Sequence, residues 1–128
     1  MDHVTDTHSI VWYFTDDTRL SRRALDVFEK TIREGVIIIP TVVLAEIMYI
    51  AGKGKITLTF DETLQKIGSY ENFIVAALDL EILKVAEKIK VNLEMHDKLI
   101  AATALYDNAS LITRDPLIIK SGACTTIW

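Results

Sequence analysis

Four acidic residues stand in or beside apolar segments, where an ionised carboxylate is unfavourable unless another group compensates for its charge. They lie far apart along the chain, at Asp6, Glu46, Asp97 and Asp115. If the fold brings the four together, they provide oxygen ligands for a hard divalent cation such as Mg²⁺. Such a cation activates water and stabilises charge at phosphorus, so the set predicts a reaction at phosphate.

Each acid also has a purely structural interpretation, which stays open at this point. Asp6, Asp97 and Asp115 each precede an expected helix and can act as its N-cap, and Pro116 strengthens this interpretation for Asp115. Glu46 differs, because its neighbours at three and four residues are apolar, which places it on the buried stripe of a helix. The sequence shows no evident cationic partner for it there. The four acids together are therefore the evidence for a metal site, since such a cluster of carboxylates would repel itself without a cation.

Apolar residues predict strands and helices in alternation. The run 36–39 consists of β-branched residues only, which is typical of a strand buried on both faces of a parallel sheet. We expect further strands to end near 5–6 and to cover 73–76, 110–113 and 125–127. We expect helices over 10–14, 21–35, 41–51, 60–67, 80–90, 98–106 and 116–120. This order predicts an α/β fold, a three-layer α/β/α sandwich with a mainly parallel sheet of about five strands, in one domain over 1–128. In such a sheet ligands gather at the carboxyl ends of the strands.

Composition narrows the function classes. Half of the 128 residues are hydrophobic, which is enough for a full core, and the net charge of −4 argues against a generic basic nucleic-acid binder. It does not argue against a nuclease, because a site made of carboxylates is acidic until a cation binds. A single cysteine, Cys124, and the absence of a signal peptide or a membrane-spanning apolar run predict a soluble, cytoplasmic protein with no membrane partner.

Four short motifs follow one another along the chain. They are Asp6-Thr7-His8 with Trp12, Ala45-Glu46-Ile47 before Lys53-Gly54-Lys55-Ile56, the run MHDKLIAATA at 95–104, and Leu111-Ile112-Thr113-Arg114-Asp115. In this order and spacing they resemble the motifs of PIN-domain ribonucleases, over essentially the whole chain. More narrowly, the chain resembles the VapC-type toxins of type II toxin–antitoxin modules.

The resemblance implies a PIN-like sandwich with endoribonuclease activity that depends on one or two Mg²⁺ or Mn²⁺ ions. It makes Asp6 the central metal ligand, adds Glu46, Asp97 and Asp115 as the other catalytic and metal-binding acids, and gives Thr113 a supporting place. Metal-activated water would then cleave RNA to leave 5′ phosphate and 3′ hydroxyl ends. A homodimer and inhibition by a cognate antitoxin protein are also implied.

Several basic and aromatic residues near these motifs are candidate RNA contacts. The basic candidates are Lys53, Lys55, Lys98 and Arg114. Each is equally interpretable as a solvated surface charge. Trp12, Tyr13, Phe14 and Tyr49 either stack on bases or belong to the core, and an apolar cluster at helical spacing is usually core.

Two other function classes remain open. One is a non-catalytic PIN-fold module that binds RNA or protein and uses the acids as caps. The other is a phosphoacceptor domain or aspartyl-phosphate phosphatase, which also places acids at the carboxyl edge of a parallel sheet. The sequence argues against this class, because His8 stands where such a phosphatase has a second Asp, and no acid pair follows the first strand.

Overall fold

Five parallel strands form the central sheet of the computed structural model, which describes residues 1–128. They are β1 (Asp2–Thr5), β2 (Val36–Pro40), β3 (Phe73–Ala76), β4 (Ser110–Ile112) and β5 (Thr126–Ile127), in the spatial order β3-β2-β1-β4-β5. Val4 of β1 pairs with Ile38 on one side and Leu111 on the other. Because β1 is the middle strand, the residue that follows it, Asp6, reaches the middle of the carboxyl edge.

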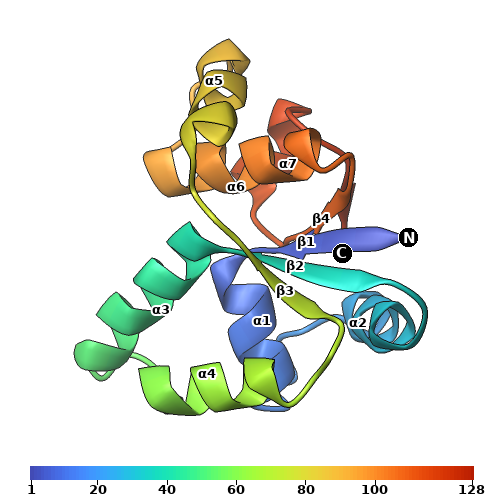
Figure 1. Ribbon diagram of the computed structural model, residues 1–128, viewed down its shortest axis with the longest axis vertical. Coiled ribbons are helices and arrows are strands. Elements are labelled where there is room, and N and C mark those ends of the chain that lie inside the picture. The colour runs from blue at the N-terminus through green and yellow to red at the C-terminus, as the bar shows by residue number, and fades with distance from the viewer.

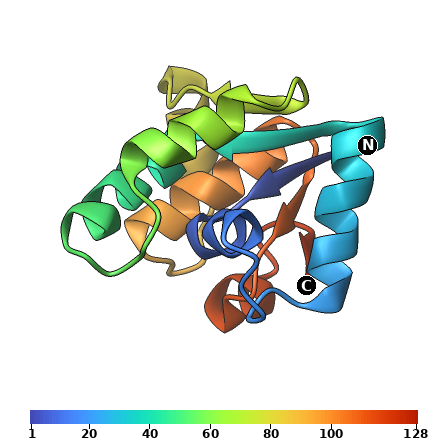
Figure 2. The ribbon, with the colours of Figure 1, turned by 90° about the horizontal axis from the view of Figure 1, so that it is seen from below.

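Seven helices cover the two faces of the sheet. They are α1 (Thr7–Phe14), α2 (Arg22–Glu34), α3 (Thr41–Gly52), α4 (Phe60–Gly68), α5 (Leu80–Lys88), α6 (Met95–Tyr106) and α7 (Pro116–Ser121). Figure 1 shows α1, α2, α3 and α4 on one side of the strands and α5, α6 and α7 on the other. Seen from below in Figure 2, α1 lies between α2 and α3. The predicted three-layer α/β/α sandwich with a parallel sheet is confirmed.

The direction in which successive strands are added to the sheet reverses between β1 and β4. Strands β2 and β3 extend the sheet to one side of β1, and β4 and β5 extend it to the other. Open α/β sheets bind ligands in the crevice outside the strand ends at such a switch point. None of the helices combines the length and the apolar character that crossing a membrane requires.

Two helices begin earlier than the sequence predicts. Helix α1 starts directly after its cap Asp6, and α6 has a cap that lies before Asp97. The carboxylate of Asp6 accepts a hydrogen bond from the Ser9 amide at 3.0 Å, so α1 starts at Thr7. At α6 the cap is Glu94, and Asp97 lies in the first turn. The N-cap interpretation is therefore confirmed for Asp6 and wrong for Asp97.

The cap of α7 agrees with its prediction. Asp115 accepts a hydrogen bond from the Leu117 amide at 2.8 Å, and Pro116 occupies the first helical position. The end of α5 differs by two residues, because Ile89 leaves the helical conformation (φ −77°, ψ 108°) and is buried in the core. These shifts change element ends and leave the order of the elements as predicted.

One buried histidine connects the middle strand with α2. The side chain of His3 is only 4 % exposed, and its Nδ1 lies 3.0 Å from the hydroxyl of Thr31. Burial of the imidazole lowers the pKa of His3, with a further contribution from the N-terminal charge. The folded protein therefore resists protonation of this residue.

We expect this histidine to make the stability of the protein pH-dependent. Below the ordinary histidine pKa of about 6.5, the unfolded chain binds a proton that folded His3 resists, so stability falls as the pH drops. The difference in Tm between wild type and a His3→Asn variant should therefore shrink from about pH 7.5 to about pH 5.5. Thermal unfolding at several pH values measures it. A difference that stays constant over this range would contradict the assignment.

Candidate active site

A cavity of about 500 Å³ at the carboxyl edge of the sheet is lined by all four acids that the sequence singles out. Asp6 follows β1, Glu46 belongs to α3, Asp97 to the first turn of α6, and Asp115 is the cap of α7. The tertiary structure therefore brings together side chains from four separate segments. Their common location is the switch point between β1 and β4, where parallel α/β sheets bind ligands.

Both carboxylate oxygens of Asp6 have hydrogen-bond donors. Oδ1 accepts from the amide of Ser9 at 3.0 Å, and Oδ2 accepts from the hydroxyl of Thr113 at 2.6 Å. The same hydroxyl accepts a hydrogen bond from the Asp115 amide at 3.1 Å, so Thr113 connects two of the acids. Burial raises the pKa of Asp6, and the hydrogen bonds from Ser9 and Thr113 oppose that rise.

The hydrogen-bond partner of Glu46 is a neutral side chain and not a basic one. The hydroxyl of Thr7, the first residue of α1, donates a hydrogen bond to its Oε1. No salt bridge involves Glu46, which is half-buried on α3. Thr7 belongs to the first sequence motif but was not among the predicted site residues. The available signal was a hydroxyl residue directly after Asp6 at the start of a helix.

The electrostatic field in the cavity is strongly negative. The pKa of Asp97 is raised to about 6 by burial and by repulsion from other carboxylates, first Asp115 and Glu94, then Glu46 and Asp6. Like charges at this proximity favour the protonated form of one member. The cavity therefore attracts cations.

A fifth acid, Glu94, lines the same cavity and was not among the predicted site residues. It caps α6 by accepting a hydrogen bond from the His96 amide at 3.1 Å. Its other oxygen lies 2.6 Å from Nδ1 of His96, and this hydrogen bond raises the pKa of the imidazole. His96 is thus held at the start of the helix by Glu94.

The carboxylate oxygens that line this cavity fit a hard divalent cation by their chemistry and by their charge. Five carboxylates line the cavity against two guanidinium groups, and none of the four predicted acids forms a salt bridge. Carboxylate oxygens are the ligands that Mg²⁺ prefers. The side chains do not converge on one point, however, because no three acidic, histidine or cysteine residues form a group arranged to hold an ion.

Two arginines are held over the ring of Trp12 at this cavity. The Cζ atoms of Arg114 and Arg19 lie 4.6 and 5.1 Å from its ring centroid, within the range of cation–π contacts. Trp12 itself is only 5 % exposed, so it belongs to the core and is not an open platform for a base. Arg19 was missed because it lies in the loop after α1, outside every motif.

The basic candidates from the sequence separate into different environments. Arg114 lines the acidic cavity, whereas Lys98 is half-buried on α6 and does not line it. Lys53 lies with its ammonium 4.9 Å from the ring centroid of exposed Tyr49. Lys55, two residues further on, lines a second cavity beside the acidic one.

The chain is similar to known proteins both in its sequence pattern and in its fold. The sequence pattern of the family described as PIN domain matches residues 4–120. VapBC2 from Rickettsia felis, bound to a DNA fragment from its promoter, matches with a TM-score of 0.78 at 18 % identity, over 100 % of this chain and 99 % of that one. A toxin–antitoxin complex from Klebsiella pneumoniae matches with a TM-score of 0.71 at 18 % identity, over 98 % and 96 % of the two chains. DNA-bound VapBC from Salmonella typhimurium matches with a TM-score of 0.71 at 16 % identity, over 99 % and 97 %. No curated protein matches.

We expect Asp6→Asn to stabilise the metal-free protein. The amide oxygen keeps the capping interaction with Ser9, since asparagine caps helices as well as aspartate does. The substitution loses the second carboxylate oxygen, which accepts from Thr113, but it also removes one charge from a repelling cluster, and we expect the second effect to be the larger. In EDTA the Tm should rise by on the order of a few degrees. Glu71→Gln, which removes an exposed charge outside the cavity, is the control and should leave Tm nearly unchanged. A lower Tm for Asp6→Asn would show that repulsion does not dominate this cluster.

Proposed function

The chain belongs to the PIN-domain family, and we propose that it is a metal-dependent endoribonuclease that serves as the toxin of a toxin–antitoxin pair. The observation that carries this proposal is that all four acids line one cavity at the switch point, namely Asp6, Glu46, Asp97 and Asp115. Members of this family are nucleases, and the acids match the quartet that the sequence motifs imply.

In the proposed site these four acids hold one or two Mg²⁺ or Mn²⁺ ions. When bound, such a cation neutralises charge on the phosphate and increases the acidity of a water molecule. The protein's own contribution is to position the ligands. Thr113 and Ser9 hold the two oxygens of Asp6, and Thr7 holds one oxygen of Glu46. Attack of water on phosphorus would break the bond to the 3′ oxygen, which takes up a proton as it leaves, so the products carry a 5′ phosphate and a 3′ hydroxyl.

We propose that Arg114 contacts the substrate phosphate. It follows Thr113 directly, lines the acidic cavity and is held over Trp12. A guanidinium forms charge-assisted, bidentate hydrogen bonds with phosphate oxygens. Its charge partly offsets the acidic field that the substrate meets.

A cognate antitoxin is the proposed protein partner. The structures from Rickettsia felis and Salmonella typhimurium are VapBC complexes, and the fold of this chain matches theirs over nearly its whole length. A basic side chain of the antitoxin would be complementary to this cavity, in which burial and repulsion from the other carboxylates raise the pKa of Asp97. We also propose a homodimer, supported by the exposed Ile74 and Val75 of edge strand β3, since an open edge favours association.

Substitution of the acids provides the direct test of the nuclease. Asp6→Asn and Asp97→Asn should each lower the rate of RNA cleavage by at least about 100-fold, because a cation ligand is lost. Glu71→Gln serves as the matched control and should cleave at the wild-type rate, with circular dichroism confirming the fold of all three variants. Addition of EDTA should abolish cleavage, and Mg²⁺ or Mn²⁺ should restore it.

Full cleavage by both purified acid variants would refute the nuclease assignment. Isothermal titration calorimetry separates the remaining alternative from it. Absence of Mg²⁺ and Mn²⁺ binding to the wild-type protein would instead favour a non-catalytic PIN-fold module that binds RNA or protein.

The partner proposal has its own measurement. A protein that co-purifies with this chain as its antitoxin should lower RNA cleavage and Mn²⁺ affinity together, because both need the same carboxylates. Titration of the partner into the chain, with cleavage and calorimetry measured side by side, tests this expectation. Undiminished metal affinity in the complex would place the partner away from the acidic cavity.

A further inference from the structure

A second cavity, of about 360 Å³, adjoins the acidic one. The two share three lining residues, His8, Trp12 and Arg19, so they lie side by side. The volume lies within the range of about 300 to 1,000 Å³ that is usual for small-ligand sites. Lys55, from the turn that follows α3, lines only this second cavity.

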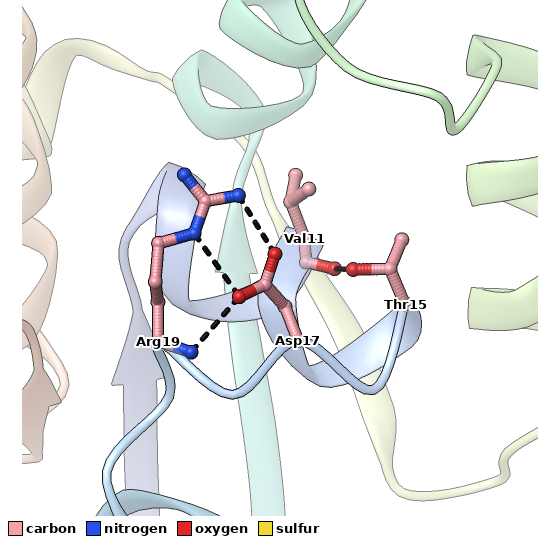
Figure 3. A network of polar contacts seen from close by, with 4 residues as sticks. All are labelled: Val11, Thr15, Asp17 and Arg19. Atoms are coloured by element: carbon pink, nitrogen blue, oxygen red, sulfur yellow. Dashed lines mark hydrogen bonds and ion pairs between the residues drawn. The ribbon is translucent and has the colours of Figure 1, made fainter.

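The charge of the second cavity differs from that of the first. It contains one acid, Asp17, and that carboxylate is already bound by Arg19. The Nε and Nη2 atoms of Arg19 donate to Asp17 at 3.0 and 2.7 Å, and the Arg19 amide donates to it at 2.8 Å, as Figure 3 shows. The side-chain hydrogen bond from Arg19 lowers the pKa of Asp17 to about 2, so the pair is ionised and its charges offset each other.

This arrangement leaves Lys55 as the uncompensated charge of the cavity, because none of the salt bridges includes it. Arg19 is pre-positioned by Asp17 and by its contact with the ring of Trp12. At the C-terminal end of α1, the Thr15 hydroxyl donates a hydrogen bond to the Val11 carbonyl at 2.8 Å (Figure 3). A fixed guanidinium loses less entropy when it binds an anion than a freely rotating one does.

We propose that the second cavity is a subsite for single-stranded RNA, in which Lys55 and Arg19 contact a backbone phosphate of a nucleotide that flanks the scissile bond. The inference rests on the proposed function. A polynucleotide bound at the acidic cavity extends beyond it on either side of the scissile phosphate, and the second cavity adjoins it. The second cavity has one acid, which is paired with Arg19, whereas five carboxylates line the first. Ile50 and Ile56 add an apolar wall for the sugar or base.

The test is the affinity for a fluorescein-labelled, mixed-sequence single-stranded oligoribonucleotide, measured by anisotropy in EDTA, where metal-dependent cleavage cannot occur. Lys55→Ala should weaken binding about tenfold, as loss of one charge-assisted contact does. The slope of log affinity against log salt should fall by about 0.7, the value for one phosphate contact of a single strand. Lys55→Arg should bind within about twofold of wild type, because it keeps the charge.

Lys53→Ala is the matched comparison, since it removes the same charge from the same turn but from a side chain over Tyr49. It should weaken binding by less than about twofold, the size expected of a screened surface charge. Equal losses for Lys53→Ala and Lys55→Ala would reduce the effect to overall charge and overturn the subsite. Unchanged binding by Lys55→Ala would overturn it as well.

The outcomes distinguish this subsite from the nuclease itself. Absence of RNA cleavage by the wild-type protein in Mg²⁺ and Mn²⁺ would refute the nuclease, while a Lys55-dependent loss of affinity would still support an RNA subsite. Conversely, cleavage that depends on Asp6 with no effect of Lys55 on binding keeps the nuclease and removes the subsite. If Lys55→Ala weakened binding of the co-purified antitoxin and not of RNA, the cavity would belong to the protein interface.

Discussion

The hydrogen bond from the Thr113 hydroxyl to the Asp6 carboxylate connects the two strands on either side of the switch point. Asp6 follows β1, and Thr113 follows β4, which pairs with β1 directly. Through its second interaction, with the Asp115 amide, the same hydroxyl positions the start of α7. A single side chain thus sets the separation of two acids, and the parallel pairing of β1 and β4 is what makes this contact possible.

Repulsion among carboxylates is the second constraint, and the fold manages it with neutral donors. Asp6 receives hydrogen bonds from an amide and a hydroxyl, and Glu46 receives one from Thr7. No lysine or arginine forms a salt bridge with either acid. Neutral donors orient a carboxylate and leave its charge in place, so the carboxylates of the cavity still repel one another. Burial, together with this repulsion, raises the pKa of Asp97 to about 6. That field is available to a cation.

Two arginines, Arg114 and Arg19, line the acidic cavity together with its carboxylates. Trp12 supports Arg114 and Arg19, and Asp17 fixes Arg19 at the junction with the second cavity. A nucleic acid needs both kinds of environment, because its scissile phosphate requires a cation-binding site and its other phosphates require fixed positive groups. The carboxylates and arginines of the acidic cavity, with Lys55 in the adjoining cavity, provide both kinds of environment side by side.

The order of strands and helices, the parallel sheet and the candidate acids were all predictable from the sequence, because they depend on local periodicity, capping residues and motif order. Glu46 shows why such prediction works, since an acid on an apolar helical stripe is detectable without coordinates. The helix start at Met95 was misplaced, because Asp97 is a preferred cap residue and Glu94 is not, although Glu94 is the cap in the structure.

By itself, the sequence determined the order of the strands and helices and identified the four acids that line one cavity in the structure. Only the tertiary structure decided their partners: Thr7 for Glu46, Thr113 for Asp6, and Arg19 for the border between the two cavities. It also separated Lys53 from Lys55, which are indistinguishable as members of one glycine-rich turn. The physical reason is that side-chain contacts depend on distances between segments remote in the chain, which local patterns of residue type do not encode.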